Sequence, residues 1–426
     1  MLSSNQLIHP NTTIYDFNYT VANKAELLQR IQYWKDYFIQ HQVKAVNLLC
    51  YQGITQTAVV FACLEQSIVI DITDHESVTA NVDIAVIGYC KKQVHDPANP
   101  KSVLIADNLQ LGYHGNNYQE TDIDPHAPFI VNGTDVYTAG DFIRAGTLGK
   151  SFFSAGQNVA TIQHISNLKT NAVWLLSPVL AGTNIYACAH LIDLSSLLYK
   201  GIADVVGLYP MHLHTLCLME RSVNSASPFG TRSFSFEFNN VTMMTIGKLP
   251  PPDVLDWALI RGAQKIQTIF VADIAPLFVN EIASSKDDLY ARTLGIPVAG
   301  IDYTLNQDNE LLIKYVDNSD DMWHNTKNIV DNTNGQLVLK GTEKINNQYV
   351  SDMQEFVCGT VSDTNIGMSD FALEADNDCL RVLTYREYVY RKFCSMQDIL
   401  TKELLNFSNV ATVQYYYVDK SQTYKI

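Results

Sequence analysis

The first seventy residues alternate between helical and strand-like hydrophobic spacing. In Ala25–Gln40 the apolar side chains recur every three or four residues, which is the spacing of an amphipathic helix. Val43–Cys50 is a strand-like apolar run, Thr55–Glu65 again has helical spacing, and Ser67–Ile72 is short and β-branched. Short connections between alternating helices and strands predict an α/β sheet.

The alternation continues, less regularly, to about residue 271. We expect strands at Val82–Tyr89, Ser102–Ala106, Ala172–Leu176, Val205–Tyr209, Val241–Ile246 and Ile266–Val271. We expect helices at Ala139–Ala160, within Thr183–Tyr199, and at His212–Arg221 and Pro252–Arg261. Proline is well tolerated in the first turn of a helix, which suits the last of these.

The pattern changes after Gly295. Short strand-like runs separated by Asn and Asp turns, up to about Lys340, predict an antiparallel subdomain. Beyond Gly341 a strand, a helix and a strand are expected at Leu380–Leu383, Met396–Leu405 and Val410–Val418. The predicted fold class is therefore α/β: a large N-terminal part (1–340) of two α/β subdomains plus an antiparallel β subdomain, and a small C-terminal α+β lid (341–426).

Composition narrows the possible functions. The net charge is −15 and the sequence pI about 5.1, with no Lys/Arg cluster, which argues against nucleic-acid binding. No apolar run reaches the ~18 residues that a membrane span needs, and the polar N-terminus lacks a basic leader. The eight cysteines are scattered without metal-binding spacing. We therefore expect a cytoplasmic protein with reduced thiols.

Several segments together resemble one enzyme family. The chain ends in a strand-like run, a polar turn and Tyr424-Lys425-Ile426, similar to the closing Gly-Lys-Ile pattern of adenylate-forming enzymes, with Tyr424 at the glycine. Gly295-Ile-Pro-Val-Ala-Gly300-Ile resembles that family's Gly-x-Pro-x-x-Gly-Val step, and Trp323–Gly335 resembles its Trp-x-x-Thr-Gly-Asp segment. The resemblance covers the acyl-CoA synthetase, adenylation-domain and luciferase superfamily, and it extends in order along nearly the whole chain.

The resemblance implies a function and a set of site residues. Such a ligase uses ATP and Mg²⁺ to activate a carboxylic acid as an acyl-adenylate, then transfers it to a thiol or amine acceptor. Lys425 would be the catalytic lysine, Asp273 a Mg²⁺ ligand and Asn328 a ribose ligand, while His212 and His214 would line the acid pocket. The remaining nucleotide-binding positions implied by the resemblance are Thr134, Thr138, Gly140, Gly247 and Phe270.

The departures from the family pattern fall on the chemistry. The family's phosphate loop contains Thr-Ser-Gly-Thr-Thr-Gly-x-Pro-Lys-Gly, whereas the nearest segments here are Asn132-Gly133-Thr134 and Thr138-Ala139-Gly140. Phe270-Val-Ala-Asp273 replaces an aromatic-Gly-x-Thr-Glu motif. A second hypothesis is therefore a pseudoenzyme that keeps the fold as a binding or scaffold module. A third is an unrelated α/β binding protein. The acid, the acceptor and the oligomeric state stay open.

One further motif suggests phosphate binding. Gly146-Thr-Leu-Gly-Lys-Ser151 matches the end of a P-loop, but Arg144 stands where the first glycine is needed and the segment has helical spacing. We interpret it as a helix whose small residues allow close packing. No Gly-x-Ser-x-Gly elbow occurs, which argues against a hydrolase.

Overall fold

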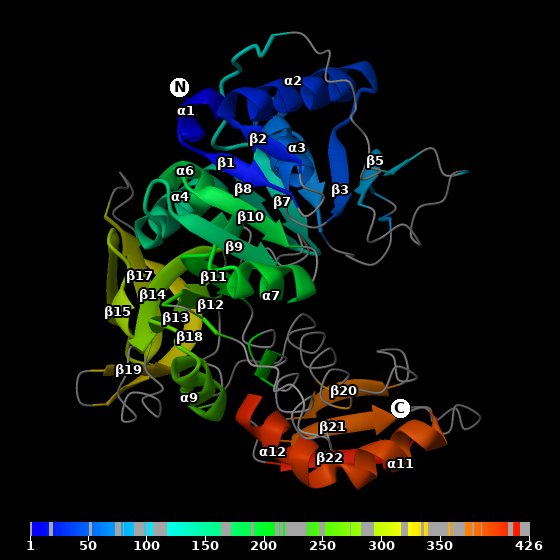
Figure 1. Ribbon diagram of the computed structural model, residues 1–426, viewed down its shortest axis with the longest axis vertical. Helices are drawn as coiled ribbons and strands as arrows, with labels where there is room; N and C mark the ends of the chain where they lie inside the picture. Colours follow the sequence, from blue (N-terminus) through cyan, green and yellow to red (C-terminus); the bar gives the residue numbers. More distant parts are fainter. Residues whose placement is uncertain are drawn as a thin grey trace.

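A computed structural model gives the architecture of the protein (Figure 1). It describes residues 2–16, 20–50, 53–72, 78–79, 81–88, 98, 101–104, 117–162, 172–188, 191–208, 213, 216–217, 237–238, 240–246, 252–272, 274–282, 294–316, 323–333, 336–339, 357, 361, 371–376, 379–384, 386–407 and 412–417. Within them the chain forms four sheets, two of them large and mostly parallel. The predicted α/β class with an antiparallel subdomain and a small C-terminal α+β region is confirmed.

The first large sheet has six strands in the order β6-β5-β3-β4-β7-β8, parallel except for the edge strand β8. Its strands are β3 (Ala45–Leu49), β4 (Val69–Asp71), β5 (Ile84–Ile87), β6 (Ser102–Leu104), β7 (Pro128–Asn132) and β8 (Asp135–Thr138). Two helices accompany it, α2 (Lys24–Gln40) and α3 (Ile54–Gln66). Helix α2 starts at a capping box of Asn23 and Glu26, which satisfies two otherwise unpaired backbone donors.

The second large sheet has nine strands in the order β15-β14-β13-β12-β11-β9-β10-β1-β2. The six central strands are parallel: β13 (Lys265–Ala272), β12 (Thr242–Ile246), β11 (Val205–Leu208), β9 (Asn158–Ile162), β10 (Asn184–Cys188) and β1 (Thr13–Tyr15). The remaining strands, at its two edges, are β14 (Ala275–Ile282), β15 (Ile296–Pro297) and β2 (Val21–Asn23). Strand β1 comes from the start of the chain, far in sequence from its neighbour β10.

Helices cover both faces of this sheet. Helix α7 (Leu191–Tyr199) and helix α9 (Pro252–Ile260) share one buried cluster with side chains such as Val206 and Met243. The π-helical turn η3 (Ala172–Leu176), which continues into α6 (Ser177–Ala181), packs Trp174 against the other face. This is the layering of a doubly wound α/β sheet.

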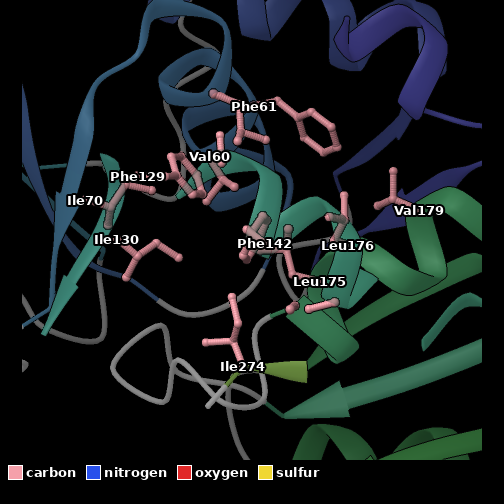
Figure 2. Close-up of a cluster of buried hydrophobic side chains, with 14 of the residues drawn as sticks. Val60, Phe61, Ile70, Phe129, Ile130, Phe142, Leu175, Leu176, Val179 and Ile274 are labelled. Carbon is pink, nitrogen blue, oxygen red and sulfur yellow. The ribbon is translucent and has the colours of Figure 1, made fainter. Parts of the chain in front are cut away.

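The largest hydrophobic cluster lies between the two large sheets (Figure 2). It brings Phe61 of α3, Phe129 of β7 and Phe142 of α4 (Ala139–Gly149) together with Leu176 of η3. Phe129 and Phe142 have ring centroids 5.1 Å apart. The two α/β units therefore share one core.

The segment after Gly295 forms the expected antiparallel sheet, in the order β16-β17-β18-β19. Its strands are β16 (Ile301–Leu305), β17 (Glu310–Tyr315), β18 (His324–Thr333) and β19 (Gln336–Leu339). Buried side chains of this sheet, including Leu311 and Ile313, join the same large cluster. The antiparallel subdomain is thus packed on the two α/β units.

The C-terminal elements have a hydrophobic core of their own. Strands β20 (Phe371–Asp376), β21 (Cys379–Thr384) and β22 (Thr412–Tyr417) pair in that order, with α11 (Glu387–Ser395) and α12 (Gln397–Phe407) packed on them. Phe371 and Phe393 meet edge to face at 5.2 Å in this core. Figure 1 shows these elements at the opposite end of the molecule from the N-terminus.

Two predicted elements are wrong in extent or type. The helix predicted at Ala139–Ala160 ends at Gly149; a 3₁₀ turn, η2 (Lys150–Phe152), and a turn at Gly156, with φ +77°, lead into β9. The strand predicted at Ala172–Leu176 is π-helical, since a short apolar run fits a buried helix equally well. The helix expected within Thr183–Tyr199 is confirmed as α7, and the residues before it form strand β10, which was not predicted.

Candidate functional site

Adjacent parallel strands end at one edge of the nine-stranded sheet. Strands β11, β12 and β13 are neighbours and end at Leu208, Ile246 and Ala272. In open α/β sheets the crevice outside the carboxyl ends of the strands is the usual ligand site. This edge is therefore the candidate site of the protein.

Four residues predicted from the resemblance follow these strands directly in sequence. Gly247 comes next after β12, Asp273 next after β13, and His212 and His214 come shortly after β11. All four lie outside the described residues, so their roles stay predictions. The strands that they follow in sequence, β11, β12 and β13, are neighbours in the sheet.

Two buried hydroxyl groups lie just inside this edge. Thr245 of β12 and Thr268 of β13 are opposite each other in the sheet, and their Oγ1 atoms are 2.9 Å apart. Both side chains are buried, so each hydroxyl relies on the other as a partner. The sequence prediction did not include them. A threonine inside each of the apolar runs Thr242–Ile246 and Lys265–Ala272 could have indicated a buried hydroxyl group in each strand.

Cys188, at the end of β10, is a poor nucleophile. Burial raises the pKa of its thiol to about 12, and the nearby carboxylate of Asp193 adds to the effect. The thiolate is the reactive form of cysteine, so a thiol with this pKa is almost wholly protonated at neutral pH.

The segment predicted as a phosphate loop is a tight hairpin turn. Strands β7 and β8 are antiparallel, and Asn132 is paired directly with Asp135, which leaves only Gly133 and Thr134 between them. Gly133 has φ +62°, the left-handed conformation that two-residue hairpin turns require at this point. Thr134 is exposed at the tip of the turn.

The other half of that predicted loop forms the start of α4. Thr138 is the N-cap: its Oγ1 accepts from the Asp141 backbone N–H at 3.1 Å and donates to Asp141 Oδ2 at 2.8 Å. Gly140 donates its backbone N–H to Pro125 O at 2.8 Å, and a Cβ at Gly140 would lie 2.8 Å from that oxygen. These groups satisfy the end of the helix and its packing.

This geometry does not fit the triphosphate of a nucleoside triphosphate such as ATP. A phosphate-holding loop presents several backbone N–H groups and hydroxyls around the phosphates, and the family segment has ten residues for this purpose. Here two residues connect the paired strands, and the hydroxyl of Thr138 is engaged within its own helix cap. The hairpin leaves no loop that could surround pyrophosphate between β7 and β8.

Phe270, predicted to stack on adenine, is a core residue. It is 5% exposed, and its ring centroid lies 6.4 Å from that of Phe278 on the neighbouring strand β14. A base could stack on this ring only if Phe278 and its neighbours moved. Ile274, two residues beyond the end of β13, is also buried in the cluster between the sheets (Figure 2).

Asn328, predicted to hold a ribose, lies half-buried in β18. Its side-chain Nδ2 donates to Thr326 O at 3.0 Å, and its backbone N–H donates to Thr326 Oγ1 at 3.3 Å. The first bond uses one of the two N–H donors of the side-chain amide, so a ribose hydroxyl would still have the second donor and the amide oxygen to bind. Lys425 lies outside the described residues.

The P-loop-like segment is helical, as predicted. Gly146 and Gly149 belong to α4, and a Cβ at Gly146 would lie 2.5 Å from Cδ2 of Leu176 in η3. A Cβ at Gly149 would meet the hydroxyl of Ser177. The small residues therefore allow α4 and η3 to pack closely, and this segment holds no phosphate.

No helix in the part of the chain that the structure describes is long and apolar enough to cross a membrane. Among the same residues, no three His, Cys, Asp or Glu side chains are grouped so that they could hold a metal ion. Asp273, the predicted Mg²⁺ ligand, lies outside these residues.

No protein-family model matches the sequence, and no curated protein matches it either. Many solved structures do match the fold. Coronafacic acid ligase from Pectobacterium brasiliense is 13% identical with a TM-score of 0.58, covering 97% of this chain and 92% of that one. A fatty acyl CoA synthetase from Mycobacterium tuberculosis is 12% identical with a TM-score of 0.59, covering 94% and 90%.

One of the matching structures contains a bound adenylate. McyG A-PCP, complexed with phenylalanyl-adenylate, is 12% identical with a TM-score of 0.64, covering 98% of this chain and 90% of that one. At such low identity the likeness concerns the course of the backbone. It extends over nearly the full length of both chains, including the C-terminal strands and helices. The chain therefore has the fold of the adenylate-forming superfamily.

Proposed function

We propose that this protein is a binding module built on the adenylate-forming fold, in which ATP-dependent activation of a carboxylic acid has been lost or reduced to a trace. The observation that carries the proposal is the two-residue turn between β7 and β8. Its ligand would be a small carboxylic acid or acyl group at the carboxyl ends of β11, β12 and β13. Nucleotide would contribute little to binding.

The chemistry explains why a short turn matters. Forming an acyl-adenylate requires pyrophosphate to be neutralised as it leaves, and preorganised donors usually supply the largest part of that stabilisation. Each lost donor costs on the order of 10²–10³ in rate. Loss of a complete loop removes several donors at once, so the rate would fall close to the uncatalysed level. The buried ring of Phe270 supports the same conclusion for adenine binding.

Calorimetry with Mg-ATP tests the proposal directly. We expect a dissociation constant no tighter than about 1 mM, equivalent to about 4 kcal/mol of binding free energy. An assay of pyrophosphate release with a panel of carboxylic acids should stay at the background level. Micromolar affinity for ATP, or acid-dependent pyrophosphate release, would overturn the proposal.

A loop graft identifies the cause of the weak binding. The family segment Thr-Ser-Gly-Thr-Thr-Gly-x-Pro-Lys-Gly would be inserted between Asn132 and Asp135, with a Gly/Ser insertion of equal length as the matched control. Insertions in exposed hairpin tips cost little closure entropy, so both variants should fold. We expect only the family segment to strengthen ATP binding. Equal affinities would mean that the adenosine contacts are lost as well.

A second candidate function is the active AMP-forming ligase itself. It is favoured by the C-terminal elements, which have their own core and are included in the match to complete ligases. In this candidate, ATP, Mg²⁺ and an acid give an acyl-adenylate for a thiol or amine acceptor. The chain would then divide into an N-terminal domain (1–340) and a C-terminal lid (341–426), with Asp273 near Mg²⁺.

Lys425 provides the test of this second candidate. If an acid is activated, Lys425→Ala should lower adenylate formation at least ~10²-fold, because one cationic donor at the developing charge is worth about 3 kcal/mol. Deletion of the last two residues should act in the same way. If both variants keep the wild-type rate, Lys425 takes no part in the reaction.

A further inference from the structure

The first residues of the chain contact both large sheets. Residues 2–16, here called the N-terminal arm, contain the short helix α1 (Ser4–Leu7) and strand β1. Leu7, Ile8 and Ile14 are buried in the cluster between the sheets. Figure 1 shows β1 between α3 and β10, its neighbour in the nine-stranded sheet.

The arm is bound at both ends of α3, on the side of the six-stranded sheet. At one end, the backbone N–H of Ser4 donates to Glu65 Oε1 at 2.9 Å. At the other end, the carboxylate of Asp16 accepts from the backbone N–H of Ile54 at 3.0 Å, in the first turn of α3. An additional backbone bond joins Ile123 N–H to Leu2 O at 2.8 Å.

The Glu65 end of this attachment is buried and fully bonded. Glu65 Oε2 pairs with Lys35 Nζ of α2 at 2.6 Å, with side-chain exposures of 0% and 3%. Tyr118 donates its hydroxyl to the same carboxylate, and burial together with that bond raises the pKa of Tyr118 well above its usual value. Ser4 is therefore tied to a fixed acceptor inside the protein.

The same arm is bound to the nine-stranded sheet between these two points. His9 N–H and Thr12 Oγ1 donate to Val179 O of α6, at 3.3 and 2.8 Å. Strand β1 then pairs with β10 in parallel register, Thr13 opposite Asn184 and Tyr15 opposite Tyr186. The two tyrosine rings stack at 4.6 Å. Hydrogen bonds along the arm thus run alternately to the two sheet units.

We propose that the N-terminal arm is a strap that fixes the orientation of the six-stranded unit relative to the nine-stranded unit. The hydrophobic cluster between the sheets is non-directional, so it holds them together without setting their angle. Hydrogen bonds are directional, and those at both ends of α3 and along β10 set the angle between the two units. Release of either end of the strap loosens β1 from β10 as well.

Gly53→Ala tests the Asp16 end of the strap. Gly53 has φ 165° and ψ −168°, an extended conformation that alanine adopts without strain. A Cβ at this position would collide with the carboxylate of Asp16, so the variant displaces the strap by steric contact alone. In hydrogen-exchange mass spectrometry of the full chain, we expect exchange in Thr13–Tyr15 to become about tenfold faster or more.

The control is Thr57→Val. The hydroxyl of Thr57 donates to Gly53 O at 2.8 Å, so this variant weakens the same first turn of α3 without contacting Asp16. We expect faster exchange in α3 and unchanged exchange in β1. If Gly53→Ala behaves like Thr57→Val, leaving β1 unchanged, Asp16 is only a helix cap and the strap proposal is overturned.

Ser4→Pro tests the other end independently. Ser4 is the first residue of α1, a position where proline suits the helix, but proline removes the N–H that donates to Glu65. Its ring also occupies the line of that hydrogen bond. We expect exchange in β1 to rise here too, although Ser4 is nine residues away from β1 in sequence. Faster exchange limited to α1 would contradict the proposal.

Discussion

The buried ion pair between Lys35 and Glu65 allows a quantitative test of how the six-stranded unit is stabilised. Lys35 Nζ donates to Glu65 Oε2 at 2.6 Å, Gln119 O at 2.6 Å and Thr121 Oγ1 at 2.8 Å, so all three of its protons are used. The side chains of the pair are 3% and 0% exposed. Lys35→Met keeps most of the apolar stem but removes the charge.

The expected loss of unfolding free energy follows from the burial of the Lys35–Glu65 pair. Removing one partner of a buried pair leaves an uncompensated charge and costs about 3–5 kcal/mol of unfolding free energy. The double variant Lys35→Met/Glu65→Gln should recover about 2 kcal/mol of this loss, because Gln can still accept from Ser4 and Tyr118 without a buried charge. Lys265→Met is the matched control: its pair with Glu281 is 31% and 46% exposed, so the expected loss is below about 1 kcal/mol.

Urea unfolding with hydrogen exchange of the α2 and α3 peptides measures the stability of this unit by itself. The exposed control should leave these peptides unchanged. If Lys35→Met costs no more than Lys265→Met, the pair is not buried from solvent as the structure shows it. The strap would then also lack a fixed acceptor at Glu65.

Three further predictions concern other parts of the chain. Gly146→Ala should destabilise the protein by about 1–3 kcal/mol in chemical denaturation despite the better helix propensity of alanine, because the new Cβ overlaps Leu176; a stabilised variant would contradict the close packing of α4 on η3. The free energy of unfolding should fall as pH rises from about 9 to 12, because burial raises the pKa of Cys188 from 9.0 to about 12 and the folded state holds a proton that the unfolded state has lost. Cys188→Ala should make the fall of unfolding free energy with pH less steep by about 1.4 kcal/mol per pH unit, and an unchanged pH dependence would exclude this thiol as a cause. Phe393→Ala should remove the contact with Phe371 and cost about 3–5 kcal/mol in the C-terminal elements, while exchange in the two large sheets stays at its wild-type rate; loosening of those sheets would show that the C-terminal core is not independent.

The sequence predicted the parts of the fold in which local spacing and burial agree. Helix α2 was predicted within one residue of its start because its apolar side chains have helical spacing, and the capping box of Asn23 and Glu26 in the structure agrees with that local signal. Strand β10 was missed because Asn184–Cys188 leads without a break in hydrophobicity towards α7, and its status as a strand depends on pairing with β9 and β1. Such pairing between distant segments is not visible in local periodicity.

The candidate site was only partly predictable for a related reason. Sequence order assigned Gly247 and Asp273 to the ends of two strands, and those strands are neighbours in the sheet. The segment Asn132–Gly140, by contrast, contained the correct residue types for a loop, and only the pairing of Asn132 with Asp135 shows how short the connection is. The number of residues left between paired strands is a property of register, which composition does not report.

The strap also has a consequence for how the protein is made. Its residues are synthesised before α3 and can bind that helix as soon as it has been made. Their partner strand β10 lies roughly 170 residues later, and at about 5–20 residues per second it takes on the order of ten to thirty seconds to appear. During this interval the edge of β1 that later pairs with β10 stays unpaired. Hydrogen bonds from Ser4 to Glu65 and from Ile54 to Asp16 would hold the arm on α3 during that time, which would limit pairing of this edge with a neighbouring copy.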